Sequence, residues 1–228
     1  MTNVNVQPVA TSPPDVRRQF MGRVYLHLVG GIGAFIGLEV VLFDTGLAAS
    51  IHDVVVRTNW LLILGGFMIV SWMATNLSHR ARSTSGAYGA YGLLIGANSL
   101  LFAAPLYQAN ALAPGAISTA AWLSIGAFAG LSFIAITTGK DFSFLRGILL
   151  WGGVIALCAI VGSVLFGVAL GTWFSLAMIA FAGAAILYDT QRVYRSFPPD
   201  AVVPAAMHLF SSVALLFWYV LRLVMDRR

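Results

Sequence analysis

Residues 147–169, GILLWGGVIALCAIVGSVLFGVA, contain no charged side chain and decide the class of this protein. An α-helix rises about 1.5 Å per residue, so roughly 20 apolar residues cross the hydrocarbon core of a bilayer. Further segments of the same character are 24–48, 59–77, 87–106, 115–138, 172–190 and 201–221. Continuously apolar runs favour helices over a β-barrel, whose strands alternate. The sequence predicts an all-α membrane protein, with a seven-transmembrane-helix bundle in residues 24–228 and a flexible cytoplasmic tail in residues 1–23.

The composition agrees with this class. Of the 228 residues, 59% are hydrophobic and only 9% are charged, whereas soluble domains carry about 25% charged residues. The net charge of +5 could indicate nucleic-acid binding, but there is no basic run or face to hold phosphates, so nucleic acid is excluded as a partner. The single cysteine, Cys158, excludes a disulfide framework.

The basic residues predict the orientation, because loops on the cytoplasmic side of a membrane protein are enriched in Lys and Arg. Most of them fall in the N-terminal tail and in alternate loops, at Arg17, Arg18, Arg23, Arg80, Arg82, Lys140, Arg146, Arg192 and Arg195. Fewer lie on the other side, at Arg57, Arg222, Arg227 and Arg228. The N-terminus is therefore expected in the cytoplasm and the C-terminus outside, provided that the last segment crosses fully.

The sequence contains few residues in patterns that could support catalysis. The metal-ligand patterns HExxH and CxxC are absent, and so are a phosphate loop and a serine nucleophile elbow. Lys140, the only lysine, lies in a loop, where it could not carry a retinal Schiff base. We expect neither an enzyme nor a resident cofactor.

Ionisable residues within the apolar segments are costly, and each therefore suggests a function. Glu39 lies deep in the first segment, either as a packed acid or as one that lines a cavity. Asp189 lies near the cytoplasmic end of the sixth. It could pair with Arg192 three residues later on the same helix, or bind a cation inside the bundle and pair with Arg80 or Arg82 from another helix.

Three stretches resemble the Bax inhibitor-1 family, also called the transmembrane Bax inhibitor motif proteins. They are LYDTQRVYR at 187–195, GLSFIAITTGKDFSFL at 130–145 and FWYVLRLV at 217–224. The similarity covers roughly residues 80–224, and the Tyr-Asp-Thr-Gln core together with the KDFSFL turn is fairly specific. It suggests a bacterial member.

Members of the family are seven-helix proteins, and some are implicated in a pH-sensitive calcium leak. The resemblance implies a gate made of two aspartates, in helices six and seven, with an arginine after helix two that pairs with the first. Asp189 matches the first aspartate, and Arg82, or alternatively Arg80, matches the arginine.

The second aspartate is replaced, because alignment on FWYVLRLV puts Ser212 at its position. Two close carboxylates would titrate near neutral pH, which one aspartate beside a serine cannot reproduce. The serine still offers an oxygen to a cation or a hydrogen bond to a carboxylate. His208, one helical turn before Ser212, could supply a pH response, or it could simply be hydrogen-bonded to a neighbour.

These observations predict a cation leak channel for calcium, in which Asp189 is the metal-contacting gate residue. The alternative is a non-conducting membrane regulator that binds a membrane-embedded protease or acts in a stress or cell-death pathway. Either way the chain would be a multi-pass protein embedded in the lipid bilayer. The brief loops favour a bacterial inner membrane.

Overall fold

The computed structural model describes residues 8–80, 83–138 and 140–227. Its elements in chain order are η1 (Val9–Thr11), α1 (Pro14–Asp44), α2 (Leu47–Arg57), α3 (Trp60–Arg80), α4 (Thr84–Leu112), α5 (Ala116–Thr137), α6 (Leu145–Phe166), α7 (Gly171–Ser196) and α8 (Val202–Asp226). Within the described ranges, seven helices are long and apolar enough to cross a membrane, which are all of the α-helices except α2. The predicted seven-helix bundle is confirmed.

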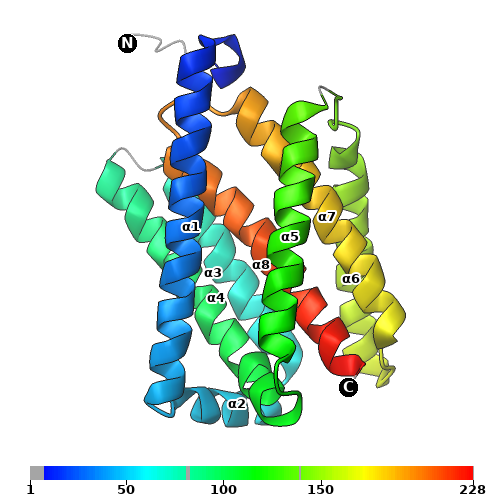
Figure 1. Ribbon diagram of the computed structural model, residues 1–228. Coiled ribbons are helices and arrows are strands. Elements are labelled where there is room, and N and C mark those ends of the chain that lie inside the picture. Colours follow the sequence, from blue (N-terminus) through cyan, green and yellow to red (C-terminus); the bar gives the residue numbers. More distant parts are fainter. Residues whose placement is uncertain (1–7, 81–82, 139, 228) are drawn as a thin grey trace.

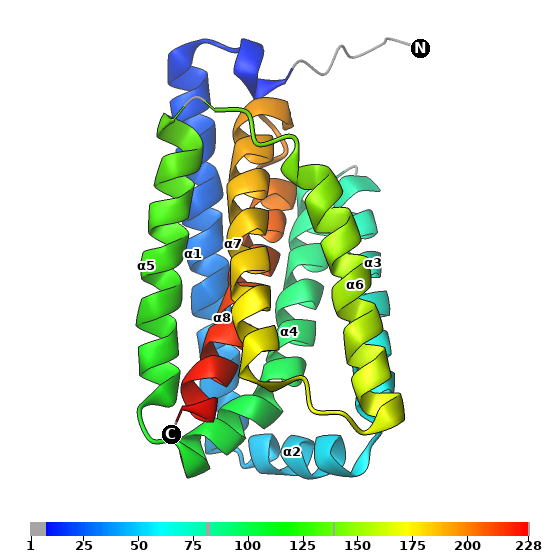
Figure 2. The same ribbon diagram turned by 90° about the vertical axis from the view of Figure 1, so that its right-hand side faces the viewer.

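Helix α8 is the centre of the bundle. It contacts α1, α3, α4, α5 and α7, and its contact with α7 is the most extensive between any two described elements. The described N-terminal segment lies at one end of the bundle, whereas the C-terminus lies at the end that α2 covers (Figures 1 and 2). Helix α8 therefore runs from one end of the bundle to the other. Which end faces the cytoplasm stays a prediction from the charges.

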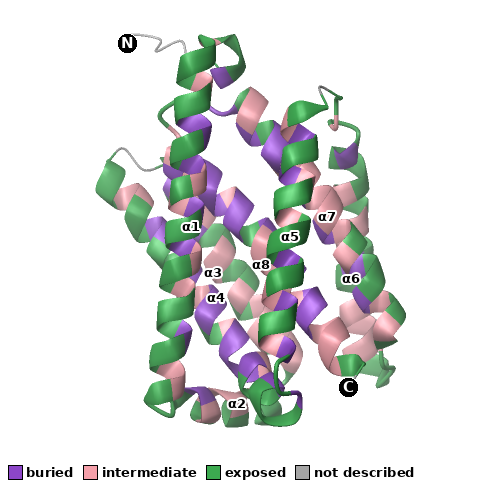
Figure 3. Ribbon diagram, in the orientation of Figure 1, coloured by how far each residue is buried: buried purple, intermediate pink, exposed green. Residues whose placement is uncertain are grey.

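The burial pattern is that of a protein surrounded by lipid. Buried residues lie mainly where the helices face one another, and exposed residues lie mainly on the outer side of the helices (Figure 3). The outer surface includes large apolar side chains that are mostly exposed, such as Trp122, Phe166 and Trp173. A water-soluble monomer rarely exposes apolar surface on this scale, whereas in a bilayer the same surface faces acyl chains.

Helix α1 starts earlier than predicted, so the expected tail of residues 1–23 is shorter than the sequence suggested. Pro14 occupies the first turn, where a missing N–H costs nothing, and Phe20 and Met21 are buried in the bundle. Val9 is fully buried, and its N–H donates to the carbonyl of Phe197 at 2.9 Å. The apolar contacts of these residues extend the helix and anchor the segment before it. Residues 1–7 lie outside the described ranges.

Helix α2 was not predicted, because residues 49–58 lie between the first two predicted apolar segments. It has 11 residues and lies across the end of the bundle (Figure 1), too short to cross a bilayer. Gly46 separates it from α1 with a φ of 76°, a left-handed conformation that glycine adopts without strain. At this glycine the chain turns from the direction of α1 into that of α2, across the end of the bundle.

Helices α1 and α4 approach closely at Gly31. A Cβ atom at this position would lie 1.9 Å from the hydroxyl oxygen of Tyr91. That hydroxyl donates to the backbone carbonyl of His27 at 3.2 Å, and Tyr91 is itself buried. The missing side chain at Gly31 therefore lets a tyrosine of α4 hydrogen-bond to the backbone of α1.

Candidate functional site

The centre of the candidate site is a hydrogen bond between two helices. The Ser212 hydroxyl of α8 donates to Oδ2 of Asp189 in α7 at 2.5 Å. Ser212 is buried and Asp189 is half-buried. Both residues belong to helices that are long and apolar enough to cross a membrane. Alignment on the last helix put Ser212 where a second acid was expected, and the fold brings that position against Asp189.

The residues after Asp189 contact other parts of the bundle. The Thr190 hydroxyl lies 3.3 Å from that of Ser132 in α5. Gln191 reaches the segment between α5 and α6, where its Oε1 accepts from the N–H of Phe142 at 2.7 Å and its Nε2 donates to the carbonyl of Lys140. Successive helical residues point about 100° apart, so three consecutive side chains bind three different neighbours of α7.

The segment between α5 and α6 is held in shape by Asp141. Its Oδ1 accepts from the Ser143 hydroxyl at 2.5 Å and from the Ser143 N–H at 2.9 Å. These hydrogen bonds, with a smaller effect from Arg195 at 3.9 Å, hold the pKa of Asp141 below its usual value. Hydrogen bonds from Gln191 and within this turn thus join two of the stretches that carried the family resemblance.

Neither of the described arginines that the sequence offered as partners pairs with Asp189. Arg192 is exposed, and its guanidinium lies 5.8 Å from the ring centroid of Phe197. Arg80, the last residue of α3, is exposed and forms no ion pair with Asp189. Arg82, the preferred candidate, lies outside the described residues. Within those residues the hydrogen-bond partner of Asp189 is a neutral hydroxyl.

His208 belongs to a separate polar cluster. Its Nε2 lies 3.4 Å from Nε2 of His79 in α3, and its ring packs edge-on against Phe197. A small cavity of about 20 Å³ lies beside the two histidines, lined also by Thr75, Ser78 and Ser211. Sequence reasoning missed His79, because no spacing along the chain links it to His208. Asp189 is not part of the wall of this cavity.

Glu39 is buried, with 6% of its surface exposed. Both of its carboxyl oxygens lack a hydrogen-bond partner among the described residues. It is not part of the wall of the small cavity beside His79 and His208. Of the two readings that the sequence left open, the structure favours the packed acid.

The comparisons with known proteins agree with this architecture. A family model described as "Inhibitor of apoptosis-promoting Bax1" matches residues 17–228, nearly the whole chain. The chain belongs to the Bax inhibitor-1 family. The match includes both halves of the candidate site, Asp189 and Ser212.

A bacterial relative of this Bax inhibitor-1 family chain is a protein of Vibrio cholerae serotype O1, described as an uncharacterized membrane protein. The two are 33% identical over 116 residues, which cover 49% of this chain and 50% of the relative. The matched region thus spans about half the length of that relative. The relative is thus also described as a membrane protein.

Proposed function

We propose that this Bax inhibitor-1 family protein is a cation leak channel, with calcium as the conducted ion and Asp189 as its gate. The observation that carries the proposal is the part-buried hydrogen bond between Asp189 and Ser212. A carboxylate inside a membrane span is costly, and such residues commonly mark ion pathways. Here the carboxylate lies at the contact between α7 and the central helix α8, where a small separation of two helices would expose it.

The chemistry of the pair suits a passing hard cation. Asp189 and Ser212 offer carboxylate and hydroxyl oxygens, the ligand type that calcium prefers, although calcium takes about six to eight of them. Water would supply the remainder. A site with only a few protein ligands binds its ion weakly, and conduction requires that a bound ion can leave again.

The hydrogen bond from Ser212 would hold the pathway closed. In this arrangement Asp189 accepts a hydrogen bond from the Ser212 hydroxyl at 2.5 Å, and it is not part of the wall of the small cavity beside His79 and His208. An entering cation would replace the hydroxyl proton as the partner of the carboxylate. Because the partner is neutral, this exchange breaks one hydrogen bond rather than a buried ion pair, which costs more to separate.

The test is calcium entry into proteoliposomes loaded with a calcium dye, at pH 6 and pH 8. Asp189→Asn keeps the size of the side chain but removes its charge, and we expect flux to fall about tenfold or more, which corresponds to about 1.4 kcal/mol of lost interaction. Asp200→Asn makes the same change at an exposed turn and is expected to conduct normally. Equal flux in wild type and Asp189→Asn would refute the assignment of the gate.

The same assay tests whether His208 supplies a pH response. His208→Phe keeps an aromatic ring against Phe197 but removes the nitrogen that faces His79. If His208 is the sensor, the ratio of flux at pH 6 to flux at pH 8 moves towards one. An unchanged ratio assigns the pH response to another group.

The second candidate is a non-conducting regulator that binds a membrane-embedded protease or another membrane protein. The observation that favours it is the same hydrogen bond from Ser212 to Asp189, because it ties α7 to α8 without any ion. A folded protein whose calcium flux equals that of empty liposomes would favour this candidate. Partner capture should then compare the full chain with one lacking residues 1–7, since a longer deletion would remove the buried Val9.

A further inference from the structure

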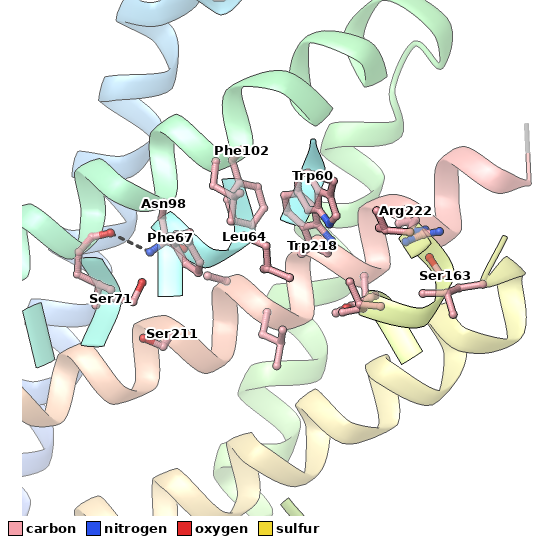
Figure 4. A pocket seen from close by; sticks show the side chains of 18 residues that line it. Trp60, Leu64, Phe67, Ser71, Asn98, Phe102, Ser163, Ser211, Trp218 and Arg222 are labelled. Atoms are coloured by element: carbon pink, nitrogen blue, oxygen red, sulfur yellow. Dashed lines mark hydrogen bonds between the residues drawn. The ribbon is translucent and has the colours of Figure 1, made fainter. Parts of the chain in front are cut away.

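A second cavity, unrelated to Asp189, lies between α3, α4, α6 and α8. It has a volume of about 610 Å³, within the range of about 300–1,000 Å³ typical of small-molecule sites. Most of its wall is apolar, including Leu64 and Phe67 of α3, Phe102 of α4 and Leu215 of α8 (Figure 4). A space of this size and lining suits an acyl chain.

Polar groups lie at the two ends of the cavity rather than along it. Ser71, Asn98 and Ser211 lie towards one end, and Arg222 and Ser163 towards the other (Figure 4). Arg222 is the one charged residue in the described wall. The cavity therefore has an apolar body with a cationic group at a single end, which is the complement of an anionic amphiphile.

Among the described residues, Arg222 has no anionic group within ion-pair distance. The residue lies one turn before the end of α8, and it forms no ion pair within the described ranges. Even Asp226, four residues later on the same helix, is not within ion-pair distance of it. A guanidinium near the end of a membrane span is costly unless it meets water, a lipid headgroup or another anion.

The wall beside Arg222 has the features of a membrane interface. Trp60 and Trp218 line this part of the cavity and stack on each other, with ring centroids 5.8 Å apart (Figure 4). Tryptophans of this kind are enriched at the level of lipid headgroups. Helices α3 and α6 both contribute to the wall and touch each other only sparsely, so the bilayer adjoins the cavity between them.

We propose that this cavity binds one anionic phospholipid, with its phosphate on Arg222 and an acyl chain between α3, α4, α6 and α8. Guanidinium groups bind phosphate oxygens through paired hydrogen bonds. The lipid would also fill the apolar space that separates α3 from α6. The site is independent of the proposed ion pathway.

Native mass spectrometry of the purified full chain tests the proposal with three added probes, palmitoyl-oleoyl phosphatidylglycerol, palmitoyl-oleoyl phosphatidylcholine and palmitate. We expect one bound phosphatidylglycerol per chain, weaker binding of phosphatidylcholine, and about tenfold or greater loss of phosphatidylglycerol affinity in Arg222→Gln, because the variant loses the charged hydrogen-bond donors to the phosphate. Arg227→Gln removes the same charge from the end of α8 outside the cavity wall, and it should bind as wild type does.

A second variant tests the acyl chain apart from the charge. Ala214→Phe adds a ring at a position in the cavity wall while leaving Arg222 in place, and it should also reduce phosphatidylglycerol binding. Equal binding by wild type, Arg222→Gln and Ala214→Phe would overturn the site. Equal affinity for phosphatidylcholine, or binding of palmitate alone, would overturn the anionic phospholipid as its occupant.

Discussion

The hydrogen bond between Ser212 and Asp189 makes a quantitative prediction about stability. Hydrogen bonds to charged groups contribute about 1.5–3 kcal/mol, whereas side-chain hydrogen bonds between membrane helices average about 0.6 and reach about 1.7 kcal/mol. The donor is buried and the two oxygens are 2.5 Å apart, so we place this bond near the upper membrane value, at about 1.5 kcal/mol. Ser212→Ala should lower the free energy of unfolding accordingly.

The neighbouring serine supplies the control. Ser211 donates to the carbonyl of Met207 in its own helix at 3.0 Å, so Ser211→Ala makes the same change in side chain without breaking a contact between helices. Unfolding by a denaturing detergent in mixed micelles, followed by circular dichroism, would compare Ser212→Ala, Asp189→Ala and the double variant. We expect a coupling energy of about 1.5 kcal/mol. Additivity within about 0.5 kcal/mol would refute the claim that this bond joins α7 to α8.

Further predictions concern a close helix contact and an exposed turn. Gly31→Ala should lower the free energy of unfolding by about 1–3 kcal/mol, measured by thermal unfolding, because its Cβ would collide with the buried Tyr91. The control is Gly33→Ala, whose Cβ would meet nothing within 4 Å, and which should be neutral or stabilising in the same measurement. Ser143→Ala removes the hydroxyl bond that lowers the pKa of Asp141, so the carboxyl carbon of Asp141, followed by NMR, should titrate at higher pH than in wild type. A carboxyl group whose pKa is lowered in the folded state contributes its full stability above the unfolded pKa and loses it as the pH falls through the folded pKa. The contribution of this turn to stability should therefore fade in the acid range. An identical Asp141 titration in the variant would contradict the assigned hydrogen bond.

Local sequence was sufficient for the class and for most helices. The segment 147–169 is apolar, contains no charged side chain and is long enough to span a bilayer, so its place in lipid follows from composition and length alone. The two errors occurred where composition was not decisive. Residues 14–23 contain arginines and polar groups yet form part of α1 because Phe20 and Met21 pack on the bundle, and α2 is too short to be recognised by the length of a span.

For the candidate site, the sequence by itself determined which residues were unusual, namely a carboxylate at Asp189 in an apolar segment and a serine at 212 where family resemblance implied an acid. Tertiary structure decided their partners, since hydrogen bonds depend on distances between helices that are remote in the chain. It joined Asp189 to Ser212 rather than to Arg192 or Arg80. Spacing along a helix shows only which side chains share a face, and the packing of α7 on α8 determines what that face meets.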